Sequence, residues 1–149
     1  MANSANTTVS QQPDPGTTGR ILVVEDELLI GLDTMSALAD AGYDVVLAGD
    51  GAEGLEVLGQ QNFDLIITDY VMPKLTGSEM IRLIRKRGVT TPVVLATSVD
   101  EAALHTGRDP WFDHYVGKPY NVHALIAVVR RMIARGQEKK IIGRNMLVA

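Results

Sequence analysis

Apolar residues in this chain gather in short runs, and each run is bounded by acidic, glycine or proline residues. Most of the runs are continuous rather than alternating, which is typical of strands that are buried on both faces of a parallel sheet. We therefore expect five strands. They cover residues 21–24, 43–48, 65–68, 93–97 and 114–116.

The segments between these runs have helical periodicity. In the first, Leu28, Leu32, Met35 and Leu38 recur with a helical spacing that predicts one buried face, and Gly42 stands where the helix would stop. The last segment predicts a helix with a broad apolar face. That face carries Val122, Leu125, Ile126, Val129, Met132 and Ile133.

Two of the expected helices carry a start signal. Asp50 is followed three residues later by Glu53, and Thr76 by Glu79, which is the spacing of a capping box. The fourth helix has weaker signals, because only residues 101–104 favour a helix before Gly107 and Pro110. We expect that helix to be short or irregular.

Strand and helix alternate five times, which predicts a doubly wound α/β fold with helices on both faces of a parallel sheet. Residues 1–19 contain almost nothing to bury and are expected to form a disordered arm. The folded domain should cover residues 20–135. Residues 136–149 are either a docked extension or a free tail.

Composition narrows the class of protein. The 149 residues suit one domain, and 46% apolar with 21% charged residues is the balance of a globular protein. A net charge of −4 gives no electrostatic reason to expect nucleic-acid binding, and the absence of cysteine excludes disulfides and thiolate metal sites. With no signal-peptide pattern and no apolar stretch near the ~20 residues of a membrane span, we expect a cytoplasmic protein.

Chemically versatile residues follow the expected strands. In a parallel α/β sheet, ligands bind outside the carboxyl ends of the strands. Glu25 and Asp26 follow the first strand, Asp69 follows the third, Thr97 ends the fourth, and Lys118 follows the fifth. The pattern predicts three carboxylates, one hydroxyl and one ammonium at a single edge.

Three carboxylates this close repel one another, and a hard divalent cation relieves that repulsion. Magnesium prefers oxygen ligands and typically takes one or two carboxylates together with a phosphate. Lys118 and Thr97 would offer positive charge and a donor to phosphoryl oxygens. The set therefore suggests a magnesium-assisted phosphoryl site, and the absence of histidine from these strand ends argues against zinc.

Several short motifs share one resemblance. Residues 23–27 read VVEDE, residues 66–73 read IITDYVMP, and residues 115–119 read YVGKP, with Gly77 and Thr97 between the last two. In order, spacing and strand position they resemble the response-regulator receiver family over about residues 20–135. Each motif alone occurs often by chance, but the ordered set is specific.

The resemblance implies a flavodoxin-like sheet of strand order 2-1-3-4-5 and a phospho-accepting role for Asp69. The phosphoryl donor would be a phosphohistidine on a sensor histidine kinase or phosphotransfer protein. Magnesium would be bound by Asp26 and Asp69, by the backbone carbonyl of Val71, and through water by Glu25. The chain would catalyse only its own phosphorylation and dephosphorylation.

The resemblance also implies a switch. Lys118 would pair with the phosphoryl group, and its peptide bond to Pro119 would be cis. Thr97 would close on the phosphoryl group while Tyr115 turns inward behind it. This would reshape the surface of the fourth helix, fifth strand and fifth helix, where a downstream protein would bind a monomer or weak homodimer.

Two positions depart from common family patterns. Val71 and Val99 lie two residues after Asp69 and Thr97, where polar groups often help to position the hydrolytic water. We therefore expect slow self-dephosphorylation.

Three other classes of protein fit the sequence less well. A haloacid-dehalogenase-like phosphatase would need a second aspartate at position 71 and its nucleophile on the first strand. A dinucleotide-binding domain would need a glycine-rich turn where the acidic residues 25–27 stand. A pseudo-receiver that only docks partners is disfavoured by the intact acidic set with Thr97 and Lys118. A chain that cannot be phosphorylated would favour this class, and a chain that can be phosphorylated would exclude it.

Overall fold

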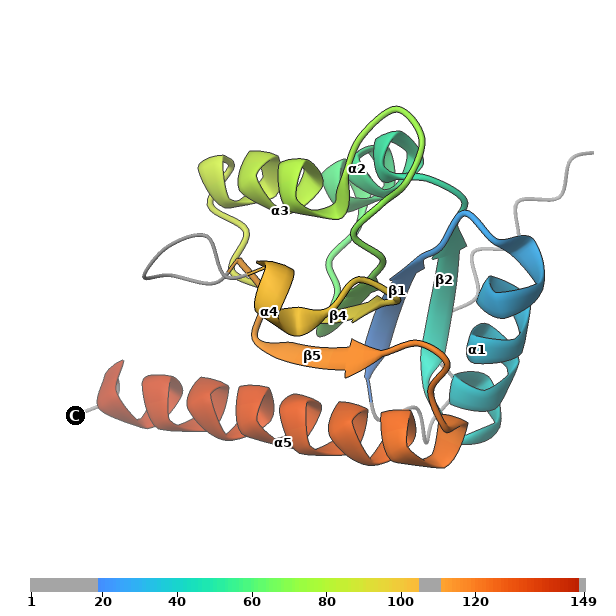
Figure 1. Ribbon diagram of the computed structural model, residues 1–149. Coiled ribbons are helices and arrows are strands. Elements are labelled where there is room, and N and C mark those ends of the chain that lie inside the picture. Colours follow the sequence, from blue (N-terminus) through green and yellow to red (C-terminus); the bar gives the residue numbers. More distant parts are fainter. Residues whose placement is uncertain (1–18, 105–110, 148–149) are drawn as a thin grey trace, which may run out of the picture.

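The computed structural model describes residues 19–104 and 111–147, in which strands and helices alternate (Figure 1). The strands are β1 (Arg20–Val24), β2 (Asp44–Ala48), β3 (Leu65–Thr68), β4 (Val93–Thr97) and β5 (His114–Gly117). The helices are α1 (Leu28–Asp40), α2 (Gly51–Gln60), α3 (Gly77–Lys86), α4 (Glu101–Leu104) and α5 (Val122–Leu147). Residues 1–18 of the expected disordered arm lie outside the described part.

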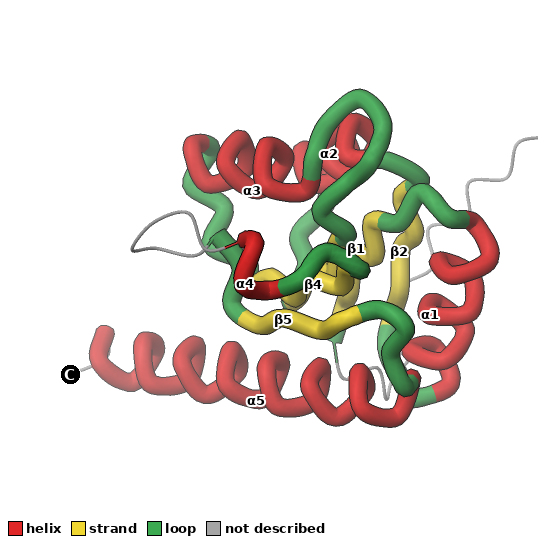
Figure 2. Tube along the Cα trace, in the orientation of Figure 1, coloured by secondary structure: helices red, strands yellow, loops and turns green. Residues whose placement is uncertain are grey.

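The five strands form one parallel sheet in the order β2-β1-β3-β4-β5, which confirms the expected fold class (Figure 2). Each strand lies within one residue of its expected bounds. Because all strands point the same way, their carboxyl ends share one edge, where functional residues were expected.

Two apolar cores hold the helices against the sheet. On one face, Leu22 and Ile66 pack with the cluster that contains Leu58 of α2 and Ile81 of α3. On the other face, Ile67 of β3 packs in the cluster that contains Leu38 of α1 and Val129 of α5. Successive residues of each strand point to opposite faces and supply both cores, so the strands are mostly apolar.

The capping residues occupy their expected places. Thr76 accepts a hydrogen bond from the backbone N–H of Glu79, whose side chain accepts one from the backbone N–H of Thr76, which completes a capping box. Asp50 likewise accepts from the N–H of Glu53 at 2.8 Å, but the Glu53 carboxylate accepts from Gly49 instead. The two caps fix where α2 and α3 begin.

The buried face of α1 differs from the expected one. Leu28 and Leu32 are 65% and 40% exposed, whereas Gly31, Thr34 and Leu38 are buried. The helix comes so close to β2 that a Cβ at Gly31 would lie 2.9 Å from a leucine methyl group of that strand. Small residues therefore face the sheet. The prediction that Leu28 and Leu32 lie on the buried face of α1 was wrong, because the helix is rotated toward Gly31 and Thr34.

Helix α5 continues without a break through residues 136–147, whose structure the sequence left open. At 1.5 Å per residue its 26 residues span about 39 Å, and Figure 1 shows its C-terminal half running past the sheet. Ile141, Ile142, Met146 and Leu147 on this half are exposed. Within the described ranges, none of the helices combines the length and apolar character needed to cross a bilayer.

Helix α4 is described only for Glu101–Leu104. The following residues 105–110, on which the expected irregularity rests, lie outside the described part, so that expectation stays a prediction.

Tyr120 ties α1 to the turn that precedes α5. Its hydroxyl lies 2.6 Å from the hydroxyl of Thr34, and burial raises the pKa of the Tyr120 phenol. Thr34 is itself only 3% exposed, so loss of this bond would leave a buried hydroxyl without its partner.

We predict that Tyr120→Phe lowers the free energy of unfolding at neutral pH by about 1–3 kcal/mol, because Thr34 loses its partner. The phenol pKa is higher in the folded than in the unfolded chain, so Tyr120 stabilises the fold fully below pH ~10 and loses this contribution as pH rises further. The gap between wild type and variant should therefore narrow above pH ~10 in urea titrations. Tyr70→Phe is the control, because the Tyr70 hydroxyl has no hydrogen-bond partner in the described ranges. Equal loss in both variants would contradict the prediction.

Candidate functional site

The acidic residues are anchored by hydrogen bonds that extend the sheet beyond its strands. The backbone N–H of Glu25 donates to the carbonyl of Ala48 at 3.0 Å, and that of Asp69 donates to Val24 at 3.2 Å. Residues that directly follow β1 and β3 are therefore held by the same kind of backbone hydrogen bond as the strands themselves.

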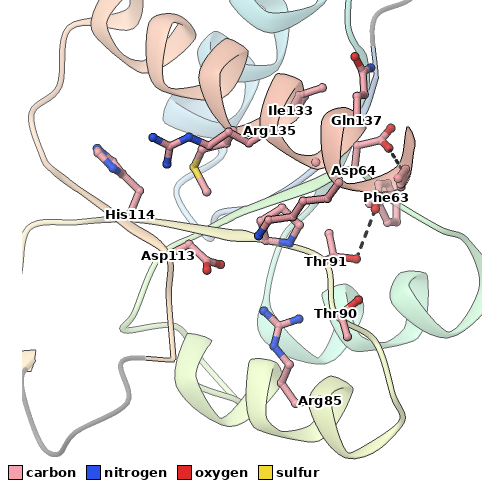
Figure 3. Close-up of a pocket in the computed structure, with 15 residues that line it drawn as sticks. Phe63, Asp64, Arg85, Thr90, Thr91, Asp113, His114, Ile133, Arg135 and Gln137 are labelled. Atoms are coloured by element: carbon pink, nitrogen blue, oxygen red, sulfur yellow. Dashed lines mark hydrogen bonds and ion pairs between the residues drawn. The ribbon is translucent and has the colours of Figure 1, made fainter. Parts of the chain in front are cut away.

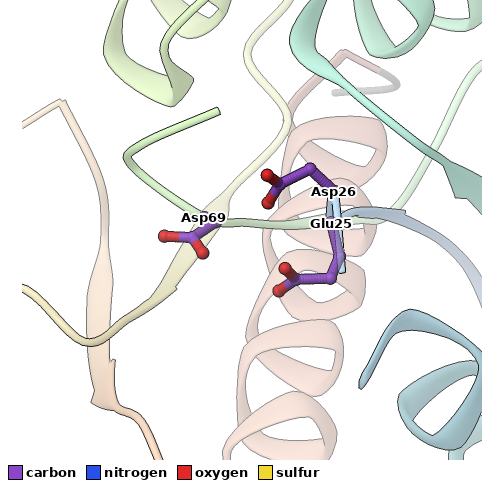
Figure 4. A group of neighbouring side chains, drawn as sticks. All are labelled: Glu25, Asp26 and Asp69. Carbon is purple, nitrogen blue, oxygen red and sulfur yellow. The ribbon is translucent and has the colours of Figure 1, made fainter. Parts of the chain in front are cut away.

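Glu25, Asp26 and Asp69 form one acidic cluster (Figure 4). One carboxylate oxygen from each lies within 4.8 Å of the others. Glu25 and Asp69 are only 5% and 9% exposed, whereas Asp26 is exposed. Among the predicted site residues, the structure thus brings together the three carboxylates.

Lys118 joins two of these carboxylates. Its Nζ donates to Asp69 Oδ2 at 2.7 Å and to Glu25 Oε2 at 2.5 Å. Burial by itself lowers the pKa of Lys118, but the hydrogen bonds to the two carboxylates outweigh it, so the pKa is raised. The ammonium is therefore firmly charged at neutral pH.

Glu25 experiences the opposite balance. Burial raises the pKa of the Glu25 carboxyl, and the negative charge of Asp69 adds to that effect. The hydrogen bonds from Lys118 and from the N–H of Glu27 lower it, but they do not compensate. Three carboxyl groups therefore share a single ammonium in this cluster.

Asp69 is fixed at each of its oxygens. Oδ1 accepts a hydrogen bond from the N–H of Tyr70 at 2.6 Å, and Oδ2 accepts from Lys118. Its backbone carbonyl accepts from the Thr68 hydroxyl at 2.9 Å. The carboxylate is therefore oriented before any ligand arrives, while part of it reaches solvent.

Gly77 permits this arrangement. Its N–H donates to the Tyr70 carbonyl at 2.8 Å, and a Cβ at this position would lie 2.1 Å from the Asp69 carbonyl oxygen. No side chain fits at such a distance. The glycine seen in the sequence next to the IITDYVMP motif therefore allows α3 to begin directly against the loop of Asp69.

Thr97 and Tyr115 meet at Val99. The buried Thr97 hydroxyl accepts from the Val99 N–H at 3.3 Å, and the Tyr115 hydroxyl donates to the Val99 carbonyl at 2.7 Å. Thr97 also contacts the site through its carbonyl, which accepts from the Lys118 N–H at 2.9 Å. Sequence reasoning missed the bridging role of Val99, because it acts through backbone atoms and its side chain gives no signal.

The donor set fits a hard cation. All candidate ligands are oxygen atoms, and the Asp26 carboxylate has no hydrogen-bond or ion-pair partner among the residues that the structure describes. Both Glu25 oxygens already accept hydrogen bonds, so this carboxylate is better suited to contact a cation through water than to bind it directly. The Val71 side chain is 61% exposed, and a role for its carbonyl stays a prediction.

The bond between Lys118 and Pro119 is cis, as expected from the resemblance. It lies where the chain leaves β5.

Comparison with known proteins identifies the family. The model of the response regulator receiver domain matches residues 21–130, and the chain belongs to this family.

Two similar curated proteins are named as a transcriptional regulatory protein and as a response regulator. The transcriptional regulatory protein DltR of Streptococcus agalactiae is 35% identical over 129 residues, which are 86% of this chain and 56% of the relative. The response regulator MprA of Mycobacterium leprae is 33% identical over 117 residues, or 78% of this chain and 51% of the relative. The chain thus spans about half the length of these relatives.

Solved structures of the family are also similar. The response regulator TrrA of Thermotoga maritima, in complex with Mg²⁺-BeF, has a TM-score of 0.69 at 32% identity, covering 76% of this chain and 97% of TrrA. The chemotaxis response regulator CheY4 of Vibrio cholerae has a TM-score of 0.71 at 30% identity, covering 78% of this chain and 99% of CheY4.

We predict that Gly77→Ala destabilises the chain by about 1–3 kcal/mol or more, because its methyl group must displace the Asp69 carbonyl. Urea unfolding measures the loss. Gly59→Ala is the matched control, since the nearest atom to a Cβ there is 3.8 Å away and alanine favours the helix. An unchanged stability in Gly77→Ala would contradict the close approach.

Proposed function

We propose that this chain accepts a phosphoryl group on Asp69 from a phosphohistidine of a sensor histidine kinase or phosphotransfer protein. The observation that carries the proposal is the Asp69 carboxylate, oriented 2.7 Å from the Lys118 ammonium inside an acidic cluster. Family membership supports the same role.

In the transfer, a carboxylate oxygen of Asp69 attacks the phosphorus atom of the donor. The new O–P bond forms as the P–N bond breaks, and the electron pair of that bond stays on the imidazole nitrogen. The Lys118 ammonium, 2.7 Å from Asp69 Oδ2, holds this carboxylate in place for the attack. Lys118 then offers its ammonium to the phosphoryl oxygens, as a positive group offsets charge in such transition states.

Magnesium is the proposed cofactor. Asp26 and Asp69 would hold it directly, the Val71 carbonyl would add a ligand, and Glu25 would act through water. When bound, the ion offsets the negative charge of the cluster and of the incoming phosphoryl group. The relative TrrA, whose structure contains Mg²⁺-BeF, supports this choice.

The contacts at Val99 suggest how phosphorylation is transmitted. A phosphoryl group adds roughly −1.5 to −2 charge and strong acceptor oxygens. Thr97 would turn its hydroxyl toward them and give up the bond from the Val99 N–H. The Val99 carbonyl is the acceptor for Tyr115, so a shift of this peptide would move the Tyr115 ring and the surface of α4, β5 and α5.

We further propose that this α4-β5-α5 surface binds a downstream protein, and that the chain is cytoplasmic and a monomer or weak homodimer. The expectation that nucleic acid takes no part rests on the net charge of this chain alone. DltR is named a transcriptional regulatory protein and is about twice the matched length, so the expectation extends no further than the surface of this chain.

Incubation with acetyl phosphate and Mg²⁺ should add one phosphoryl group to the wild-type chain, detected by intact-mass spectrometry. Asp69→Asn should abolish the addition, because the amide is not a nucleophile. Asp40→Asn, at the exposed end of α1, is the control and should be phosphorylated like wild type. A wild-type chain that stays unmodified would favour the pseudo-receiver that only docks partners.

We predict a long-lived phosphoryl group, because the exposed Val71 side chain offers no hydrogen bond to an attacking water. Val71→Asn should shorten the lifetime several-fold in a radiolabel chase without phosphatase. Leu83→Asn is the control, since Leu83 is also an exposed apolar residue but lies on α3. A wild-type lifetime that is already short, or unchanged in Val71→Asn, would contradict the prediction.

A further inference from the structure

A cavity of about 630 Å³ lies at the edge of the sheet opposite to the Asp69 site (Figure 3). Asp64, Pro92 and Asp113 line it, and they directly precede β3, β4 and β5 respectively. The wall on one side is the second half of α5, and the C-terminal part of α3 contributes Arg85. The acidic cluster, by contrast, follows the carboxyl ends of the strands, so the two sites are separate.

The cavity is positively charged although the chain is acidic overall. Its cationic side chains are Arg85, Arg135, Lys139 and Lys140, and its acidic ones are Asp64 and Asp113. The lining therefore carries an excess of two positive charges, against −4 for the whole chain. In Figure 3, Arg85 and Arg135 extend from helices on different sides of the hollow.

The acidic residues of the cavity are already engaged. Asp64 pairs with Lys140 at 3.2 Å, and Asp113 accepts a hydrogen bond from the Val93 N–H at 2.7 Å. Arg85 donates one hydrogen bond, to the Val89 carbonyl at 3.0 Å. Neither acid forms an ion pair with Arg135 or Lys139 among the described residues.

Arg135 and Lys139 are the cations left over. Neither has an ion-pair or hydrogen-bond partner within residues 19–104 and 111–147. They stand four residues apart on α5, a spacing at which like charges face each other and destabilise a helix. An anion in the cavity would remove this repulsion and would gain two charge-assisted contacts.

The rest of the cavity lining could accommodate the apolar part of a small organic molecule. Pro92, Met132 and Ile133 supply apolar surface, and the volume lies in the range of small-molecule sites. Gly136 lines the same wall and has no side chain, so nothing projects into the cavity from this position. The arrangement thus combines an anion-binding side with an apolar side.

We infer that this cavity binds a small organic phosphate, with its phosphate group held by Arg135 and Lys139 and its organic part against Pro92, Met132 and Ile133. The site is independent of the proposed phosphorylation of Asp69. It would let the concentration of a phosphorylated metabolite bear on a signalling domain through α5.

The test uses the full chain without divalent cations, which keeps a metal–nucleotide complex from the acidic cluster. ADP is the probe, followed by ¹⁵N-resolved NMR and by calorimetry, with adenosine and pyrophosphate as comparisons. ADP should shift the amide signals of cavity residues and saturate, and it should bind at least as tightly as pyrophosphate. Adenosine should bind at least ten-fold more weakly.

Matched variants locate the site. Arg135→Ala with Lys139→Ala should weaken ADP binding at least ten-fold, whereas Arg130→Ala with Arg131→Ala removes the same charge from exposed positions outside the cavity and should not. Gly136→Glu should block the cavity. Gly143→Glu places the same side chain on the same helix away from it and should leave binding intact.

The inference is overturned if ADP does not saturate, if both double variants or both glutamate variants lose binding equally, or if the shifted signals lie at Glu25, Asp26 and Asp69. Tighter binding of pyrophosphate than of ADP would also overturn it, because the apolar side would then contribute nothing. None of these results affects phosphorylation by acetyl phosphate, so the two proposals fail separately.

Discussion

The ammonium of Lys118 lies between the carboxylates of Asp69 and Glu25, which follow different strands of the sheet. This contact connects the ends of β1, β3 and β5 and makes a buried acidic cluster tolerable. An uncompensated buried carboxylate would cost several kcal/mol. Because one ammonium serves two buried acids, the cluster still carries excess negative charge, which a cation can offset. The same contact, together with the Tyr70 N–H, fixes the orientation of the Asp69 carboxylate.

Backbone hydrogen bonds and a helix cap hold the residues around that contact in place. The loop after β3 is held by the N–H of Gly77 on one side and by the Thr68 hydroxyl on the other. The capping box at Thr76 sets where α3 begins. Val99, whose backbone N–H donates to Thr97 and whose carbonyl accepts from Tyr115, links the end of β4 to β5. Residues without a charge thus position the charged side chains of the site.

The sheet order was expected only from the family resemblance. The strand bounds and the convergence of Glu25, Asp26, Asp69 and Lys118 could be anticipated from the residues, because strands buried on both faces leave short continuous apolar runs and the site residues directly follow these runs. The rotation of α1 could not. Its packing depends on Gly31 and Thr34, small residues that a hydrophobic period does not weight. The charged cavity could not be anticipated either, since Asp64, Arg85 and the α5 pair Arg135 and Lys139 come from three distant parts of the sequence.

The most direct test of the account is a crystal structure of the chain with Mg²⁺ and beryllofluoride, a phosphoryl mimic. We expect beryllofluoride on an Asp69 carboxylate oxygen, a cation held by Asp26 and Asp69, and the Lys118 ammonium in contact with a fluorine atom. A structure grown with both reagents in which Asp69 is unmodified, or in which the cation is held by other residues, would contradict it.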